Sequence, residues 1–466
     1  MREGVFMKAI PPIDVQEIID RASVSRTQKK ALILCLAFGI VDGFDSLITG
    51  FVVPAIARDW DVSVASLTPV ALAAVFGTIF GATILAPRAD RFGRRPVVFG
   101  GAALFGVFTV AAAFAPNMET LVVLRFVAGL GLGAVPATLI AYGTEMAPSR
   151  LRGTVVTVIG AGLAAGGFFG GFAAGFLIPA FGWRSLFIVG GIAPLLLILV
   201  AIRYLPETAQ FSALAGNRET VVGLLKKIDP SVEIKDDAPL ALREKEVHRS
   251  NLRALFDSGR GQMTVVLWVL FLFQFLGSFF IFSWLPSVLT NAGVDETAAL
   301  LATSACTLGG MIGGVLLGMT IDRVASRFRV LACSYSIGAV AVIASAFSTA
   351  ALPALFVALF VTGFGMIGTG VCMNAVGASL YPSKIRTTAI GWFSGWGRVG
   401  SVLGPAIGGL LLGLGLSSKS IFLFSAAPAA ICAICVVLLS IASRKLDSEV
   451  EAVVAVQSPA DNVGVL

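Results

Sequence analysis

Long apolar segments alternate with short polar loops along most of this chain. An α-helix needs about 20 residues, at ~1.5 Å each, to cross the hydrocarbon layer of a bilayer. Most of the apolar segments reach that length, so the pattern predicts an all-α membrane protein with twelve transmembrane helices. The segments are residues 31–57, 66–87, 97–116, 119–146, 154–179, 185–205, 263–290, 297–320, 330–348, 352–381, 388–413 and 419–443.

Lysine and arginine concentrate in alternate loops. Cytoplasmic loops of membrane proteins carry an excess of these residues, so the alternation predicts an even number of helices with both termini in the cytoplasm. The opposite loops hold only Arg58, Arg184 and Lys419. The net charge of +7 follows from this topology and does not indicate a nucleic-acid partner.

Composition narrows the class of protein further. Only 13% of the residues are charged, against about 25% in soluble proteins. The sequence has no nucleophile–base arrangement and no cluster with metal-ligand spacing, so we expect neither catalysis nor a bound metal. It also has no nucleotide-binding loop, so we expect a proton gradient to supply the energy, with no other cofactor.

The two halves of the chain are related by a repeat. Residues 148–154 match 382–388, and Asp90-Arg91 matches Asp322-Arg323 at almost the same offset. Parallel six-helix repeats are typical of two-bundle transporters whose substrate site lies between the bundles. We therefore divide the chain into a cytoplasmic N-terminal segment (1–30), a first six-helix bundle (31–205), a cytoplasmic central loop (206–262), a second six-helix bundle (263–443) and a cytoplasmic tail (444–466).

Two carboxylates interrupt the first apolar segment. Asp42 and Asp45 are three residues apart and so share a helix face, roughly 17–21 Å into the span. A carboxylate at that depth costs several kcal/mol unless it faces water or a cation. We expect these two residues to carry or sense the coupled proton.

Three further charges, like the two aspartates, have no charged counterpart in the other half: Arg125, Glu145 and Arg398. Arg125 can pair with an ionised carboxylate of the first apolar segment and release it on protonation, which would make the pair a proton switch. A purely structural ion pair is the alternative. Arg398 can hold the carboxylate of an anionic substrate, or pair with another buried acid. We group Glu145 with the proton-coupling residues, although its place at the end of a span also suits a gate.

The loop after the second apolar segment carries Asp90-Arg91-Phe92-Gly93-Arg94-Arg95. Such a loop can bridge neighbouring helix ends when the cytoplasmic side is closed; a solvated basic loop is the alternative. The motif Asp-Arg-x-Gly-Arg-Arg resembles the signature of the major facilitator superfamily, although the preceding Ala86 and Arg88 depart from its usual pattern. The gating residues that we expect are Asp90, Arg91, Gly93, Arg94, Arg152, Asp322, Arg323 and Arg386.

Within that superfamily, Asp42-Gly43-Phe44-Asp45 resembles the aromatic acid:proton symporter family, and Gly397-Arg398-x-Gly400 fits the same family. The resemblance implies a secondary transporter of a bacterial inner membrane. It would import an aromatic carboxylate, such as benzoate or hydroxybenzoate, by proton symport and alternating access. The expected partners are this substrate, protons and the lipid bilayer, with no obligate protein partner.

An aromatic substrate needs apolar walls with a few polar groups. Trp392 and Trp396 share a helix face close to Arg398, and Gln274 and Asn374 can bind ring hydroxyls. We expect these five residues to bind substrate, with helix packing as the alternative for the tryptophans and helix–helix hydrogen bonds for the amides. Other functions stay open: transport of another organic acid or a sugar, export or antiport, and a membrane sensor.

Overall fold

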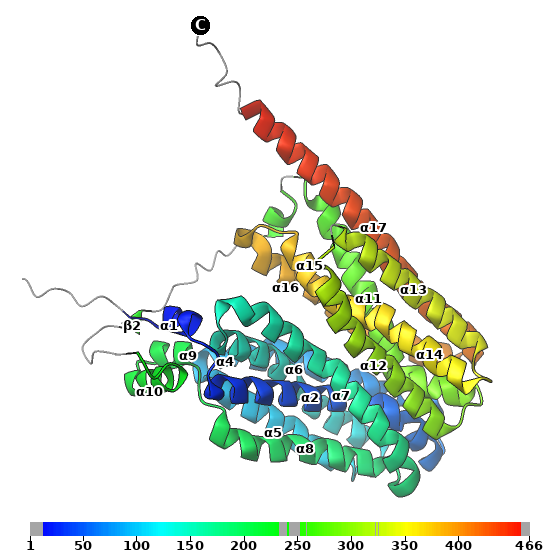
Figure 1. The fold of residues 1–466 in the computed structure, drawn as a ribbon. Helices are drawn as coiled ribbons and strands as arrows, with labels where there is room; N and C mark the ends of the chain where they lie inside the picture. Colours follow the sequence, from blue (N-terminus) through cyan, green and yellow to red (C-terminus); the bar gives the residue numbers. More distant parts are fainter. Residues whose placement is uncertain are drawn as a thin grey trace, which may run out of the picture. The chain divides into compact units, whose positions relative to one another are not determined.

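The computed structural model describes residues 13–232, 240–241, 252–257, 259–321, 323–324 and 326–457. Nearly all of these residues are helical (Figure 1), which confirms the expected all-α architecture. The only sheet in the described part consists of two short parallel strands, β1 (Ile13–Asp14) and β2 (Leu240–Ala241).

Eleven helices in the described part of the chain are long and apolar enough to cross a membrane by length and composition. The remaining predicted span is α16 (Ser383–Gly413), which is 31 residues long but rich in glycine and hydroxyl side chains. The other spans are α2 (Arg26–Asp59), α3 (Thr68–Phe80) with its flanking turns, α5 (Arg94–Ala112), α6 (Met118–Met146), α7 (Arg152–Phe181), α8 (Trp183–Tyr204), α11 (Gly261–Asn291), α12 (Glu296–Ile321), α13 (Arg327–Phe347), α14 (Leu352–Thr362) with α15 (Thr369–Ser379), and α17 (Ser418–Gln457).

Short helices lie before the first span, beside the loop motif and after the sixth span. A short lead-in helix, α1 (Val15–Arg21), precedes the first span, with Asp14 as its N-cap. The amphipathic piece after the sixth span is α10 (Arg218–Ile228). The remaining short helices and turns are η1 (Val64–Leu67), η2 (Gly81–Leu85), η3 (Ala86–Arg88), α4 (Ala89–Phe92), η4 (Ser149–Leu151), α9 (Ala209–Leu214), η5 (Leu252–Leu255) and η6 (Gly363–Gly368).

The chain forms two compact units. The first comprises Met1–Ile48, Ala73–Gly166 and Trp183–Glu246. The second comprises Thr49–Leu72, Gly167–Gly182 and Val247–Leu466. The C-terminal ends of α2 and α7 thus belong with the later helices, so the units do not follow the predicted domain boundaries. Those boundaries, and the location of the termini, stay predictions.

Glycines bring the helices of the first unit into backbone contact. A Cβ at Gly166 of α7 would collide with the backbone of Ile40 and Phe44 on α2. Likewise, a Cβ at Gly131 of α6 would collide with the Gly101 carbonyl of α5. Small residues allow this close approach in membranes, where van der Waals packing rather than the hydrophobic effect holds helices together.

In the second unit, a π-helical segment, η6, joins α14 to α15. Its glycines pack against α12 and α13: Gly363 faces the Cys306 carbonyl, and Gly365 faces Gly338. One π-helical turn inside a longer helix often occurs at a functional site.

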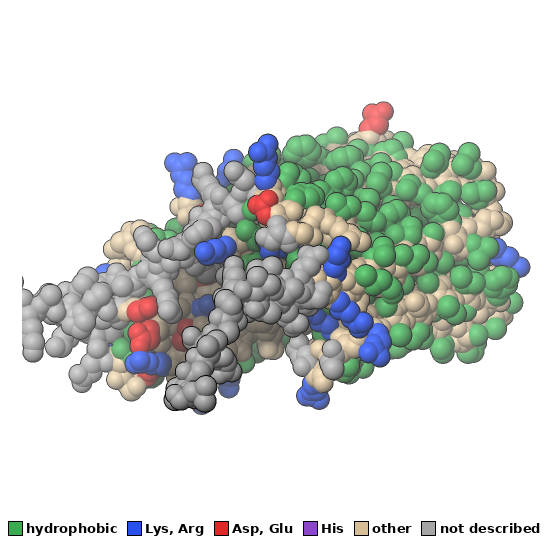
Figure 2. Space-filling view, turned by 90° about the horizontal axis from the view of Figure 1, so that it is seen from above, with side chains coloured by type: hydrophobic (Ala, Val, Ile, Leu, Met, Phe, Trp, Pro, Cys, Tyr) green, Lys and Arg blue, Asp and Glu red, His purple; other side chains and the backbone are tan. Residues whose placement is uncertain are grey.

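The outer surface is suited to lipid. Figure 2 shows a broad zone of hydrophobic side chains on the visible face, with most Lys and Arg side chains outside that zone. On α7, Phe169, Phe172 and Phe176 are each about half exposed. Because a bilayer solvates such side chains, their exposure is expected in a membrane protein.

Replacing Gly166 by Ala should lower the stability of the protein by ~1–3 kcal/mol, since the new methyl group has no space between α7 and α2. The matched control is Gly160→Ala on the same helix, where a Cβ would meet nothing within 4 Å. That variant should be as stable as the wild type, or up to ~1 kcal/mol more stable. Thermal unfolding of the detergent-purified variants measures the difference, and equal melting temperatures would contradict the packing argument.

Candidate functional site

A buried ion pair lies at the centre of the first unit. Arg125 of α6 donates from Nη2 to Oδ2 of Asp45 at 3.0 Å, and from Nη1 to Oδ1 at 3.3 Å. Both side chains are fully buried. The structure thus brings together Arg125 and one of the two carboxylates of α2.

Two further groups complete the surroundings of this pair. Thr109 of α5 donates its hydroxyl hydrogen to Oδ1 of Asp45 at 2.7 Å and accepts from Nη1 of Arg125 at 3.0 Å. The guanidinium also lies 5.4 Å from the ring centre of Phe187 on α8. Four helices therefore enclose one compensated pair of charges, as the low dielectric of a membrane protein requires.

Asp42 lies one turn earlier on α2 in a different environment. It is 4% exposed, and its Oδ1 is buried without a hydrogen-bond partner in the described structure. Gly39 and Gly43 flank it and face the backbone of α7 at Ile159 and Leu163. The two aspartates that the sequence could not tell apart are therefore distinct: one is paired and the other is not.

At the end of the first unit where α4 meets α5, Arg94 connects two carboxylates. Its Nη2 lies 2.9 Å from Oε1 of Glu145, and its Nη1 lies 2.8 Å from Oδ1 of Asp90. Glu145 is 12% exposed and Asp90 is 80% exposed. The structure therefore places Glu145 in the loop network, beside the expected gating residues rather than beside Asp45.

Glu207, which follows α8, caps the N-terminus of α5 and was missed by sequence analysis. Its carboxylate accepts from the backbone N–H groups of Arg94 at 3.1 Å and Arg95 at 3.2 Å. A carboxylate is favourable there because the N–H groups at the start of a helix have no other partner. Gly93 has φ +103°, and a Cβ there would lie 2.5 Å from Oε2 of Glu207, so this position needs glycine. An acidic residue directly after an apolar span was the available signal.

The lead-in helix α1 is fixed to the loop between α6 and α7 by Asp20. The Asp20 carboxylate accepts from the backbone N–H of Ser149 at 2.8 Å and from its hydroxyl at 2.5 Å. Burial tends to raise the pKa of Asp20, but the bonds from Ser149 and Gln16 and the charge of Arg152 outweigh it, so the pKa lies below its ordinary value. A lowered pKa stabilises the folded state above the ordinary value, and this contribution is lost as the pH falls through the lowered one.

In the second unit, Arg398 of α16 is half-buried and forms no ion pair with any carboxylate of the described residues. An arginine inside a span without a protein counter-ion suits an anionic ligand better than the alternative of a structural pair. Trp392 and Trp396 stack on Trp268 of α11, with ring centres 5.5 and 5.9 Å apart. Trp392 and Trp396 were expected on one face from the sequence, but Trp268 was not expected beside them, because it lies on another helix.

The two candidate amides differ in their surroundings. Gln274 is 5% exposed and donates to the Met366 carbonyl of η6 at 3.1 Å and to Ser278 at 3.0 Å. Its Oε1 is buried without a partner in the described structure. Asn374 is exposed and donates to the Gly370 carbonyl of its own helix. Gln274 thus connects α11 to η6, while the exposed Asn374 bonds only within its own helix among the contacts described.

The remaining gating candidates are dispersed. Arg91 is exposed over the ring of Phe92, and Arg323 is exposed. Arg386 donates to the Tyr381 carbonyl at 3.3 Å, and Arg152 lies 3.9 Å from the carboxylate of Asp20. Asp322 lies outside the described residues.

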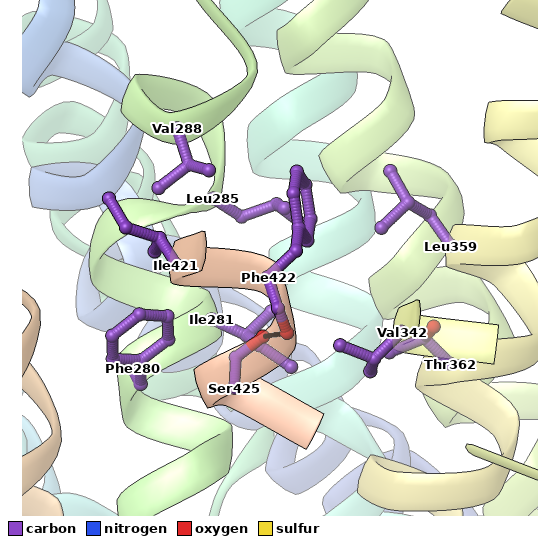
Figure 3. A pocket seen from close by; sticks show the side chains of 10 residues that line it. All are labelled: Phe280, Ile281, Leu285, Val288, Val342, Leu359, Thr362, Ile421, Phe422 and Ser425. Atoms are coloured by element: carbon purple, nitrogen blue, oxygen red, sulfur yellow. Dashed lines mark hydrogen bonds between the residues drawn. The ribbon is translucent and has the colours of Figure 1, made fainter. Parts of the chain in front are cut away.

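An apolar pocket in the second unit is too small to hold the substrate. It measures about 20 Å³ and lies between α11, α13, α14 and α17 (Figure 3). Its lining is hydrophobic except for Thr362 and Ser425, and the Ser425 hydroxyl donates to the Phe422 carbonyl at 2.7 Å. Space of this size holds about one water molecule. None of the residues expected to bind substrate lines this pocket.

The sequence of the chain matches the family model of the Major Facilitator Superfamily over residues 34–329 and 267–462. The chain is therefore a multi-pass membrane transporter of this superfamily and not an enzyme. The fold agrees: the crystal structure of a D-xylose–proton symporter covers 88% of this chain and 97% of its own, with a TM-score of 0.67 at 18% identity. An inward-open xylose transporter from Escherichia coli gives a TM-score of 0.65 at 16% identity, covering 87% of this chain and 95% of its own.

Closer relatives identify the family within the superfamily. A 4-hydroxybenzoate transporter of Acinetobacter baylyi is 34% identical over 93% of this chain and 95% of its own. A gallate transporter of Pseudomonas putida is 31% identical over 90% of this chain and 93% of its own. The chain belongs to this family of bacterial aromatic acid transporters, which confirms the resemblance seen in helix 1 and places the protein in the bacterial inner membrane.

Glu145→Gln should destabilise the protein by ~1–2 kcal/mol, because it leaves the mostly buried guanidinium of Arg94 without its buried counter-charge. Asp90→Asn removes the other carboxylate of the same arginine, but that group is 80% exposed, so the change should stay within ~0.5 kcal/mol. Melting temperatures of the two purified variants make the comparison. A larger fall in melting temperature for Asp90→Asn than for Glu145→Gln would show that the exposure of the carboxylate does not determine the strength of these two ion pairs.

Proposed function

We propose that this protein imports an aromatic carboxylate together with protons. The observation that carries the proposal is the similarity to 4-hydroxybenzoate and gallate transporters over about nine-tenths of the chain. Arg398 supports it from the chemistry, since a guanidinium that pairs with no carboxylate of the described residues offers two parallel hydrogen bonds to a substrate carboxylate. Trp392, Trp396 and Trp268 supply aromatic surface on the adjoining helices.

Proton coupling is assigned to the pair of Asp45 and Arg125. While Asp45 is ionised, the pair is neutral overall and stable in its buried place. Protonation of Asp45 cancels the attraction and leaves the Arg125 charge uncompensated, which favours a different arrangement of the surrounding helices. Proton binding and helix rearrangement are thereby linked through one contact.

Alternating access is the proposed transport cycle, and contacts in the second unit support it. There the C-terminal end of α2 packs on α11, where a Cβ at Gly50 would collide with the Phe282 carbonyl. Arg58, in the last turn of α2, forms an ion pair with Glu296 at the start of α12. Contacts between helices of the two predicted bundles, held by one partly exposed ion pair, can close one end of a transporter and release it again.

Uptake into cells or proteoliposomes tests the function directly. We expect accumulation of labelled hydroxylated benzoates against their gradient when the outside is acidic, with an accompanying rise in external pH. Unlabelled dicarboxylates and sugars serve as competitors that should not reduce the uptake of the labelled benzoates. If no aromatic acid is taken up, the proposal fails, and proton movement opposite to the substrate would identify an antiporter instead.

Asp45→Asn should abolish accumulation of substrate against its gradient, because the amide keeps the size of the side chain but cannot cycle a proton. Exchange of internal for external substrate needs no net proton movement and should persist. Glu119→Gln, which changes an exposed carboxylate at the start of α6, is the control. Unchanged uphill uptake by Asp45→Asn would remove Asp45 from the coupling mechanism.

A further inference from the structure

The Thr109 hydroxyl differs from those of most threonines inside the spans. Thr138, Thr303 and Thr362 each donate to the carbonyl four residues earlier in their own helix. This local bond satisfies a hydroxyl in an apolar setting without any partner from another helix. Thr109 instead donates across to Asp45 on α2 and accepts from Arg125 on α6.

Close helix packing fixes the position of this hydroxyl. On the α6 side, Gly101 of α5 lies against Gly131. On the α8 side, Gly106 of α5 lies against Gly191. Thr109 itself is fully buried, and a β-branched side chain in a helix has few rotamers. The hydroxyl is therefore held between the two charges and cannot turn away to water.

Four helices, α2, α5, α6 and α8, contribute a defined group to the environment of the Asp45–Arg125 pair. Arg125 of α6 supplies the positive charge, and Asp42 supplies a second carboxylate from the same helix. The neutral groups are the Thr109 hydroxyl from α5 and the ring of Phe187 from α8. Thr109 is thus the neutral hydrogen-bond donor to the Asp45 side chain.

A hydroxyl can serve both protonation states of a carboxyl group. It donates to the ionised carboxylate, as seen here, and it accepts from the O–H of the protonated acid. The donated bond favours the ionised state, and hydrogen bonds to charged groups are the stronger ones. The same hydroxyl also orients Arg125 through the bond that it accepts.

We propose that Thr109 is a positioning residue that sets the pH at which Asp45 takes up its proton, and with it the pH range of transport. Thr109 holds the Asp45 carboxylate in its ionised, Arg125-bound form until the external pH is low enough. The inference deepens the proposed function and rests on it for the transport measurement.

Thr109→Val tests the inference, because valine has nearly the same shape but cannot donate a hydrogen bond. Losing one bond to a charged group should shift the pH of half-maximal proton-driven uptake upward by about one unit. Thr109→Ser keeps the hydroxyl and should restore the wild-type profile. Thr138→Val is the matched control, since it removes a buried threonine hydroxyl that bonds only its own helix, and its profile should not move.

A second measurement does not depend on transport. Infrared difference spectra of the purified protein, recorded over a range of pH, contain the carboxylic acid C=O band of Asp45, identified by its loss in Asp45→Asn. The band should appear at a pH about one unit higher in Thr109→Val than in the wild type. If Thr109→Val does not accumulate in membranes, Thr109→Cys, with a weak S–H donor, should give an upward shift in the same direction.

The outcomes separate this inference from the proposed function. Slower uptake by Thr109→Val with an unmoved pH profile and an unmoved infrared band would reduce Thr109 to a packing role and overturn the inference. Absence of aromatic acid uptake by the wild type would refute the proposed function, and the infrared titration would still decide the role of Thr109.

Discussion

A fully buried charge in a membrane-spanning helix bundle needs a counter-charge within hydrogen-bond distance, and Asp45 and Arg125 meet that requirement. The first unit is arranged around this need. The guanidinium belongs to α6, the carboxylate to α2, the bridging hydroxyl of Thr109 to α5 and the covering ring of Phe187 to α8. Glycines at the helix contacts allow these four helices to approach closely enough for groups from all of them to meet.

Charges near the ends of the spans follow a different rule. Arg94 bonds to the Glu145 carboxylate and to the Ala89 carbonyl, and Glu207 accepts from the backbone N–H of Arg94, so that one cluster both neutralises charge and caps α5. These groups are partly exposed, and solvent shares in compensating them. Protonation would therefore disrupt the buried pair of Asp45 and Arg125. In the cluster around Arg94, each ion pair contributes less to stability the more exposed its carboxylate is.

The spans, the lead-in helix and the amphipathic α10 could be predicted from sequence, because apolar length and helical periodicity are local properties. The pairing of Arg125 with a carboxylate of α2 could be predicted, because charges are rare inside a span and need a counter-charge. The choice of Asp45 over Asp42 could not be predicted, because both share one face of α2 and the choice depends on where α5 and α6 lie. Thr109 and Trp268 were missed for the same reason: their roles arise from neighbours on other helices, and their residue types are ordinary in a span.

The π-helical segment η6, between Thr362 and Thr369, has a consequence for the helix that follows it. A π-helical turn holds one residue more than an α-helical turn, so later residues are rotated by about 100° relative to an unbroken α-helix. This rotation sets which neighbours Cys372 and Asn374 face. A relative that lacks one residue here would present a different face of α15, turned by about 100°, to its neighbours. A one-residue gap at this place in an alignment therefore marks a change of helix phase, not a shortened loop.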